Sequence, residues 1–431
     1  MLWLDLETYC ELPISVGTYR YAESCEVDLL AFAFDDEPVT VLDITAGEWL
    51  PPRLADYLLN GDGPITAHNA MFDRTCLRLG NLKLDIPIHR WRCSMVRALA
   101  HGLPGKLAAL GDILNIEQDK RKLKTGRDLM MLFCKPRPKN SKIRRATRET
   151  HPREREQYIA YAGNDIEAMR AICAKLPKWN MTDTLPEPGQ DPTAAQRELM
   201  LWHRDQQVND RGFRIDLDLA KACLRAIDRE QIKLKKQARD QTDEAVQSTL
   251  QRDAVLEFVL HEYGVDLPDL RRATLERFLD RDDVDYGLRE LLLLRLEAST
   301  TSTSKYKTLL KAVSSDGRLR GTIQYSGAAR TMRAAGRTFQ PQNLPSRGIM
   351  SRAELPPAID ALLADADDML YDNVMHVTSS TIRSCIIAAP GHKLVVSDLA
   401  NIEGRVAAWL AGEDWKLQAF RDYDAGVGPD L

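Results

Sequence analysis

Two acidic residues near the N-terminus, Asp5 and Glu7, have types and a spacing that suggest chemistry. They lie in MLWLDLETY, where apolar and acidic residues alternate, so a strand here places both carboxylates on one face. Two anions held side by side are unfavourable unless a cation compensates them, and carboxylate oxygens suit Mg²⁺. The pair therefore indicates a metal site, although an exposed acidic edge of a sheet has the same short pattern.

Two further acidic residues occur in longer motifs. In ITAHNAMFDRTCL, Asp73 follows Asn69 by four residues where a strand is predicted to lead into a helix; Asn69 also fits an ordinary helix cap there. In REQYIAYAGNDIEAMRAI, an amphipathic helix places Tyr161 and Asp165 on one face, because they are four residues apart. A packed tyrosine above a solvated acid gives the same spacing.

In this order, the three motifs resemble those of the DEDD exonuclease superfamily, and the tyrosine fits its tyrosine subclass. The resemblance covers residues 1 to about 180 and implies a ribonuclease H-like α/β fold with 3'-5' exonuclease activity. It implies that four carboxylates hold two Mg²⁺ ions, with Mn²⁺ as an alternative, while a tyrosine orients the attacking water. The residues with these predicted roles are Asp5, Glu7, Asp73 and Asp165 as ligands and Tyr161 as the tyrosine, with Asn69 as a DNA contact.

A strongly basic segment follows from Lys120 to Arg148. It contains twelve Lys or Arg residues against a single acid, Asp128. Such local charge is typical of a surface that faces phosphates, and Arg144 and Arg145 are the predicted DNA contacts. A solvated charged loop remains the alternative.

A second polar strip, GAARTMRAAGRTFQPQNLP, spans residues 327–345. Its arginines, glutamines and asparagine suit contacts to the backbone and minor groove of a duplex. It resembles the segment that grips primer-template in family A DNA polymerases, except that Met332 stands where a glycine is usual; the alternative is a basic loop in an unrelated fold. The predicted DNA contacts are Arg330, Arg333, Arg337, Gln340, Gln342 and Asn343.

The segment KLVVSDLANIEGRVAAWLAG predicts a strand that ends at Asp398, followed by a helix containing Glu403. It resembles motif A of the same polymerases. The resemblance implies that Asp398 binds a catalytic Mg²⁺ and the nucleotide, and that Glu403 belongs to the gate that excludes ribonucleotides. A buried aspartate that caps a helix fits the same residues.

The segments VNDRGFRIDLDLA and STSKYKTLL resemble the start of the polymerase domain and the tip of its helical thumb. Lys305 and Tyr306 are predicted to contact DNA, with an ordinary helix surface as the alternative.

These motifs predict an α/β ribonuclease H-like exonuclease domain followed by the helical thumb and partial α+β palm of a right-hand polymerase. A stretch with three prolines, NMTDTLPEPGQDPT, separates the first two parts. The predicted domains are residues 1–180 (exonuclease), 181–193 (linker), 194–315 (start of the polymerase and thumb) and 316–431 (partial palm).

Composition limits the other possibilities. A net charge of -4 excludes a uniformly basic nucleic-acid protein. The eight cysteines show no C-x-x-C pair, which predicts reduced thiols and a cytoplasmic location, in a bacterial host if the chain is phage-encoded. No apolar run is long enough for a membrane span, and the N-terminal strand leaves no room for a signal peptide.

The predicted function is therefore the N-terminal part of a DNA-directed DNA polymerase with a proofreading exonuclease, whose partners are primer-template and single-stranded 3' ends. The residues after Asp398 supply neither a second palm carboxylate nor a fingers helix. We expect either a second polypeptide that carries them or a truncated product that retains nuclease activity alone. A stand-alone DEDD exonuclease acting on DNA or RNA, and a nonenzymatic primer-template binding factor, are the alternatives.

Overall fold

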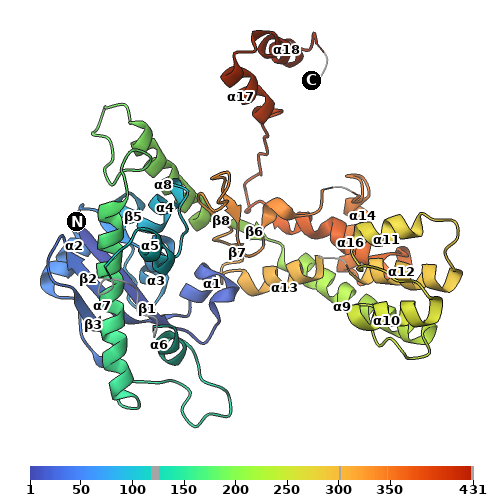
Figure 1. The fold of residues 1–431 in the computed structure, drawn as a ribbon, viewed down its shortest axis with the longest axis horizontal. Coiled ribbons are helices and arrows are strands. Elements are labelled where there is room, and N and C mark those ends of the chain that lie inside the picture. Colours follow the sequence, from blue (N-terminus) through green and yellow to red (C-terminus); the bar gives the residue numbers. More distant parts are fainter. Residues whose placement is uncertain (118–125, 300–301, 347, 429–431) are drawn as a thin grey trace. The chain divides into compact units, whose positions relative to one another are not determined.

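The computed structural model describes residues 1–117, 126–299, 302–346 and 348–428 (Figure 1). Contacts divide the chain into two compact units, Met1–Ile387 and Ala388–Leu431. The predicted boundaries at residues 180, 193 and 315 fall inside the first unit and stay predictions. Among the described residues, no helix is both long and apolar enough to cross a membrane.

The first unit begins with a mixed five-stranded sheet in the order β3-β2-β1-β4-β5. Strand β1 pairs antiparallel with β2 and parallel with β4, and so lies at the centre of the sheet. The α/β character expected of the N-terminal region is confirmed. Its strands are β1 (Leu2–Tyr9), β2 (Glu26–Phe34), β3 (Thr40–Asp43), β4 (Ile65–Ala67) and β5 (Trp91–Cys93).

Successive residues of β1 contribute to two cores, one on each face of the sheet. Leu4 and Leu6 are buried with residues of α3, whereas Trp3 is buried with residues of α7. Asp5 and Glu7 therefore point to the α7 face, because side chains alternate along a strand. The surrounding elements are η1 (Ile14–Val16), α1 (Thr18–Ala22), η2 (Ile44–Ala46), α2 (Pro52–Leu59), α3 (Ala70–Leu79), η3 (Ile88–Arg90), α4 (Ser94–Ala100), α5 (Leu107–Ile113), α6 (Gly126–Phe133) and α7 (Pro152–Lys175).

Helix α7 is fixed to the sheet by a buried ionic group. The Arg155 guanidinium donates to Asp28 on β2 at 2.7 Å and to Asp43 on β3 at 2.6 Å. Burial alone would raise the pKa of Asp43, but the hydrogen bonds from Arg155 hold it below the usual value. Because these buried charges are paired and hydrogen-bonded, removing one partner would be strongly destabilising. The ionic group thus sets the position of Tyr161 and Asp165 further along α7.

Helix α8 (Ala194–Arg211) attaches the sheet to the rest of the first unit. Residues 176–193, which include the predicted linker, form neither helix nor strand, and α8 begins with a capping box made by Thr193 and Gln196. Near its end, Asp210 accepts hydrogen bonds from Arg74 at 2.8 Å and Arg78 at 2.9 Å, both on α3. The end of α8 is therefore bound to the N-terminal region by charge-assisted hydrogen bonds.

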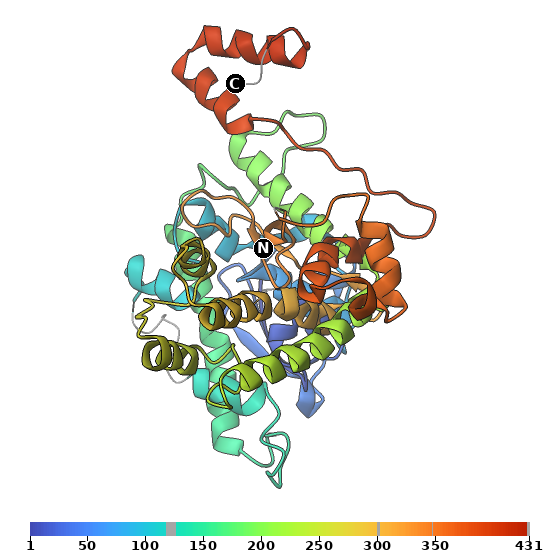
Figure 2. The same ribbon diagram turned by 90° about the vertical axis from the view of Figure 1, so that its right-hand side faces the viewer.

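The remainder of the first unit is mostly helical, as expected. The long helix α9 packs against α12, α13, α14 and α16 (Figures 1 and 2), and α10, α11 and α12 enclose a separate small core. The helices are α9 (Leu217–Gln241), α10 (Arg252–Tyr263), α11 (Arg272–Leu279), α12 (Tyr286–Ala298), α13 (Ser302–Ala312), α14 (Leu355–Leu363), α15 (Asp367–Leu370) and α16 (Val374–Thr381).

Short strands and turns lie between these helices. Strand β6 pairs with both β7 and β10, and β8 pairs with β9 in a two-stranded hairpin. Their bounds are β6 (Phe213–Ile215), β7 (Arg318–Leu319), β8 (Ile323–Gln324), β9 (Ala335–Gly336), η5 (Pro341–Asn343), η6 (Ile382–Cys385) and β10 (Ile386–Ile387).

The second unit contains α17 (Ile402–Ala411) and α18 (Asp414–Asp424). The predicted helix after Asp398 is present, but the predicted strand before it is wrong, because residues 388–401 form no strand. Val395 and Val396 are 82% and 89% exposed. A strand is stabilised by hydrogen bonds to neighbouring strands, and none of the described residues pairs with this segment.

Candidate functional site

Three carboxylates from β1 and α7 meet at one point. Asp5, Glu7 and Asp165 each place an oxygen within 4.8 Å of the others. Asp5 is half-buried, whereas Glu7 and Asp165 are buried. Like charges this close repel one another, and oxygen donors of this kind fit a hard divalent cation such as Mg²⁺. The donor set therefore matches the metal that the sequence predicts.

The fourth predicted carboxylate, Asp73, lies outside this group of three. It is in the first turn of α3 and is buried, and its Oδ1 accepts a hydrogen bond from the backbone N–H of Leu6 at 3.2 Å. Burial raises the pKa of Asp73 to about 8, and the charge of Glu7 adds to the shift. Asp73 thus braces β1 between the two predicted ligands of that strand.

Tyr161 is buried on α7, where its ring lies parallel to that of Tyr158 with centroids 6.4 Å apart. Burial raises its pKa, and the nearby carboxylate of Asp165 raises it further. The hydroxyl therefore stays protonated at neutral pH and can donate a hydrogen bond.

The carboxylates open into a cleft of about 730 Å³, called here the acidic cleft. The apolar Phe72 and the basic Arg127 and Lys135 also line it. Apolar walls with a few polar groups and nearby cations suit a ligand that combines bases with phosphates.

Two residues beside Glu7 were not singled out from the sequence. The Tyr158 hydroxyl lies 3.0 Å from Glu7 Oε2 and 2.9 Å from the Cys134 sulfur. Burial raises the pKa of both Tyr158 and Cys134. Tyr158 precedes Tyr161 by three residues on a helix, and this spacing was a signal that both face the sheet. No comparable signal marks Cys134.

A second cleft, of about 1030 Å³, adjoins the acidic cleft, and Ile14 and Asn69 line both. We call it the basic cleft, because the described residues that line it include Lys106 and Arg337 but no acidic residue. Asn69 has a left-handed backbone with φ of 64° and makes no side-chain cap to α3, so the ordinary helix cap considered from the sequence is not formed.

The predicted basic segment is partly engaged in ion pairs. Arg144 lies 3.3 Å from Glu11, and Arg145 pairs with Glu26 at 2.5 Å while stacking over Tyr9. Residues 120–125 of this segment lie outside the described residues. The two arginines therefore have a structural role in this state, and their contact with DNA stays a prediction.

The strip of residues 327–345 contains most of the connection between β8 and β9, strand β9 itself and η5. All six of its predicted DNA contacts are exposed. Met332 has a φ of 56°, in the left-handed region that glycine adopts most readily. This conformation explains why a glycine suits the position. The exposed residues are Arg330, Arg333, Arg337, Gln340, Gln342 and Asn343.

The two residues predicted at the thumb have different environments. Lys305 is half-buried and donates to the Phe339 carbonyl at 3.0 Å. Tyr306 is fully buried, with its hydroxyl 2.8 Å from the Thr378 carbonyl. The expectation that Tyr306 reaches DNA is therefore wrong in this conformation, because the residue belongs to the core.

Asp398 and Glu403 belong to the second unit, and both are exposed. Asp398 Oδ1 accepts a hydrogen bond from the Leu399 N–H at 2.9 Å, while Asn401 is the residue at the N-cap of α17. The alternative in which a buried Asp398 caps the helix is thus not realised. Their roles in binding metal and nucleotide stay predictions.

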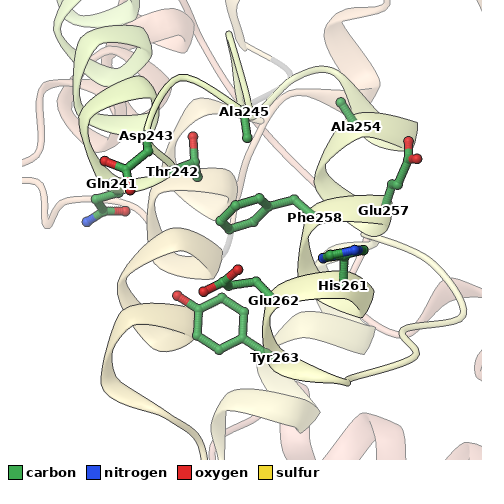
Figure 3. Close-up of a pocket in the computed structure, with 10 residues that line it drawn as sticks. All are labelled: Gln241, Thr242, Asp243, Ala245, Ala254, Glu257, Phe258, His261, Glu262 and Tyr263. Atoms are coloured by element: carbon green, nitrogen blue, oxygen red, sulfur yellow. The ribbon is translucent and has the colours of Figure 1, made fainter.

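A third cleft, of about 500 Å³, lies in the helical region between α9 and α10 (Figure 3). Asp243, Glu257 and Glu262 line it together with His261. These acids oppose phosphate binding, so the cleft is a poor candidate for a nucleic-acid site.

Comparison with solved structures gives the class of fold. The chain matches the POL domain of Pol1 from M. smegmatis, solved in complex with DNA primer-template and dNTP, with a TM-score of 0.55. The match covers 94% of this chain and 58% of that chain at 14% sequence identity. The chain therefore shares the fold of that domain.

A comparison with curated proteins gives a match of higher sequence identity than the solved structure does. The chain is 35% identical over 428 residues to the DNA polymerase of Bacillus phage SP02. The match covers 98% of this chain and 63% of that protein, so the chain spans less than two thirds of its relative's length. No protein-family model matches the chain.

Proposed function

We propose that the chain is part of a phage-type family A DNA polymerase and carries a 3'-5' proofreading exonuclease in a ribonuclease H-like N-terminal domain. Similarity to the SP02 polymerase supports the polymerase assignment, and the mixed sheet with helices on both faces supports the ribonuclease H-like domain. The observation that carries the exonuclease is the group of Asp5, Glu7 and Asp165 at the acidic cleft.

Each residue of the acidic cleft has a proposed task. Asp5, Glu7 and Asp165 hold divalent cations, and Asp73 joins them through its second carboxylate oxygen, because Oδ1 accepts from Leu6. Bound Mg²⁺ or Mn²⁺ would supply the positive charge that stabilises the attacking and leaving oxygens in phosphodiester hydrolysis. Tyr161 orients the water through its hydroxyl.

The basic cleft is the proposed path of a single-stranded 3' end toward these carboxylates. Arg337 belongs to both the exposed strip and the lining of the basic cleft, and Asn69 stands where the basic and acidic clefts meet. Because the described residues of this path include bases and no acids, the path favours a polyanion. Primer-template would lie along the strip, with Arg330, Arg333 and Gln342 contacting its backbone.

DNA synthesis is proposed to need a further polypeptide segment carrying fingers and a second palm carboxylate. Asp398 and Glu403 would contribute to the nucleotide and metal site. The exposed Val395 and Val396 support a missing strand partner, since apolar residues of a strand are normally covered. Either a longer form of this protein or a separate chain can supply the segment.

The first test is incubation of the purified chain with a 5'-labelled primer-template and Mg²⁺, with and without dNTPs. We expect shortening of the primer in both conditions. Asp5→Ala should abolish shortening because a metal ligand is lost, while DNA binding persists through the strip. Asp36→Ala, at an exposed turn, is the matched control and should retain activity.

The other outcomes of this assay separate the alternatives. Digestion that persists in Asp5→Ala contradicts the assigned site. Faster digestion of RNA than of DNA favours a stand-alone DEDD nuclease, and binding without digestion favours a nonenzymatic primer-template factor. Extension of the primer by the pure chain contradicts the need for another segment.

A further inference from the structure

The hydroxyl of Tyr158 stands between a thiol and one of the predicted metal ligands. It lies 3.0 Å from Glu7 Oε2 and 2.9 Å from the sulfur of Cys134, and the same sulfur is 3.6 Å from Glu7 Oε2. A tyrosine hydroxyl has one hydrogen to donate. The Tyr158 hydroxyl donates its hydrogen to Glu7 Oε2, and the one hydrogen of the Cys134 thiol lies within reach of both Glu7 Oε2 and the Tyr158 oxygen.

The Tyr158 ring is held rigidly in this place. It is fully buried and stacks on Phe133 with centroids 4.9 Å apart and an angle of 13° between the planes. The Arg155 guanidinium lies over the Tyr158 ring, 5.7 Å from its centroid, and the Tyr161 ring lies parallel to it. A donor fixed by such packing directs its hydrogen bond to one point, and so restricts the carboxylate that accepts it.

From this geometry we infer that Tyr158 is a positioning residue that orients the Glu7 carboxylate for metal binding, with Cys134 orienting the Tyr158 hydroxyl in turn. This inference rests on the proposed exonuclease. One oxygen of Glu7 is engaged by Tyr158, which fixes the plane of the carboxylate relative to Asp5 and Asp165. Hydrogen bonds to a ligating group typically change metal affinity or activity by about 10–100-fold.

Packing alone does not require the hydroxyl. Phenylalanine would preserve the stack on Phe133, whereas a buried tyrosine hydroxyl needs a hydrogen-bond partner. The partner here, Glu7, is one of the three carboxylates of the proposed metal site, and the hydroxyl therefore has a task beyond filling space.

The test compares Tyr158→Phe with the unmodified full chain by calorimetric titration with Mn²⁺. Asp5→Ala identifies the binding phase that belongs to the acidic cleft. We expect Tyr158→Phe to weaken this phase about 10–100-fold, and to raise the Mg²⁺ concentration needed for half-maximal exonuclease rate by a similar factor. Saturating Mg²⁺ should restore most of the rate.

Tyr306→Phe is the matched control. Tyr306 is also fully buried, and its hydroxyl donates to the Thr378 carbonyl at 2.8 Å, away from the acidic cleft. It should lower the thermal midpoint as much as Tyr158→Phe does, without changing Mn²⁺ affinity. Cys134→Ala gives a second variant, for which we expect a smaller loss of affinity in the same direction.

The outcomes distinguish this inference from the proposed function. Unchanged Mn²⁺ affinity in Tyr158→Phe overturns the positioning role while leaving the exonuclease intact. A rate loss in Tyr158→Phe that saturating Mg²⁺ does not restore also overturns it and indicates a structural role. Absence of any Mn²⁺ phase sensitive to Asp5→Ala, together with absence of digestion, rejects the exonuclease itself.

Discussion

Asp73 differs from the other predicted ligands in what its carboxylate does. Asp5, Glu7 and Asp165 gather at the acidic cleft, whereas Asp73 accepts a hydrogen bond from the backbone of β1. Removing the acceptor would leave the buried N–H of Leu6 without a hydrogen-bond partner. Such a loss lowers the free energy of unfolding by about 1–3 kcal/mol. Asp73 therefore has a structural task that is separable from its proposed role as a ligand.

Two substitutions at Asp73 separate these tasks. Asp73→Asn keeps an oxygen to accept from Leu6 and should be at least as stable, because burial makes the carboxylate of Asp73 costly to ionise. An amide cannot ionise to bind a cation, so digestion should be abolished. Asp73→Ala should also lose about 1–3 kcal/mol of stability. Denaturant unfolding and the primer-shortening assay measure the two effects. Digestion by Asp73→Asn at the normal rate would show that its charge is not used.

Much of the site at the level of single residues could be predicted from the sequence. The alternation around Asp5 and Glu7 and the four-residue spacing of Tyr161 and Asp165 depend on local periodicity, which the structure preserves. Cys134 could not be predicted, because its contact with Glu7 joins residues 127 positions apart. The burial of Tyr306 was missed because its DNA contact was inferred from a resemblance to the polymerase thumb. Its three-residue spacing from Leu309, which is buried in the same core, was the local signal that it faces inward.

Helix α6 can approach the Tyr161 ring closely because its first residue, Gly126, has no side chain. A Cβ on Gly126 would overlap the Tyr161 ring, so the first residue of α6 and the tyrosine of α7 are closely fitted. Steric overlap with this ring therefore restricts position 126 to glycine.

Gly126→Ala should displace the Tyr161 ring and lower both the exonuclease rate and stability, the latter by about 1–3 kcal/mol as for an overpacked core. Gly163→Ala is the matched control. A Cβ at Gly163, inside α7, would lie 3.4 Å from Val41, and alanine should stabilise the helix by up to about 1 kcal/mol. Equal effects of the two alanines in thermal unfolding would refute the steric argument.

The segments on either side of Asp398 show which secondary structure a local sequence pattern can predict and which it cannot. The helix after Asp398 formed as predicted because its periodicity and length are local properties. The strand before it did not form, since strand pairing depends on a distant segment as well as on β-branched residues. Val395 and Val396 have the composition of a strand without a neighbour among the described residues.

At the scale of the whole molecule, α8 connects the sheet to the helical region through buried polar groups. His203 lies in α8 and donates through Nε2 to the Trp91 carbonyl of β5 at 2.9 Å. Burial lowers the pKa of His203 from 6.5 to about 4. Between these two values the unfolded chain binds more protons than the folded chain at this residue, so its contribution to stability falls as pH falls.

The pH dependence of unfolding tests this connection. His203→Gln keeps a side-chain donor and removes the titration, so the free energy of unfolding should fall less steeply than in the unmodified chain between pH 6.5 and 4. The difference should approach about 1.4 kcal/mol per pH unit at most. Burial raises the pKa of the neighbouring Asp205 to about 6, which acts in the opposite direction. Parallel profiles for the two proteins would contradict the assignment.

The order of a mixed sheet followed by a mostly helical region was predictable, because acidic strand motifs and helical periodicity occupy separate parts of the sequence. The contacts between these parts were not predictable. Asp210 joins α8 to Arg74 and Arg78 across more than a hundred residues, and single charged residues carry no signal of such distant partners.

Ile14 and Asn69 line both clefts, and this continuity determines whether a DNA strand end is transferred within one molecule or between two. Under the proposed function, a strand end that leaves the exposed strip reaches the carboxylates of the same molecule, since both lie in Met1–Ile387. The effective concentration of such a tethered end is on the order of millimolar. Transfer is then a first-order event that neither dilution of the protein nor excess competing DNA slows once the complex has formed.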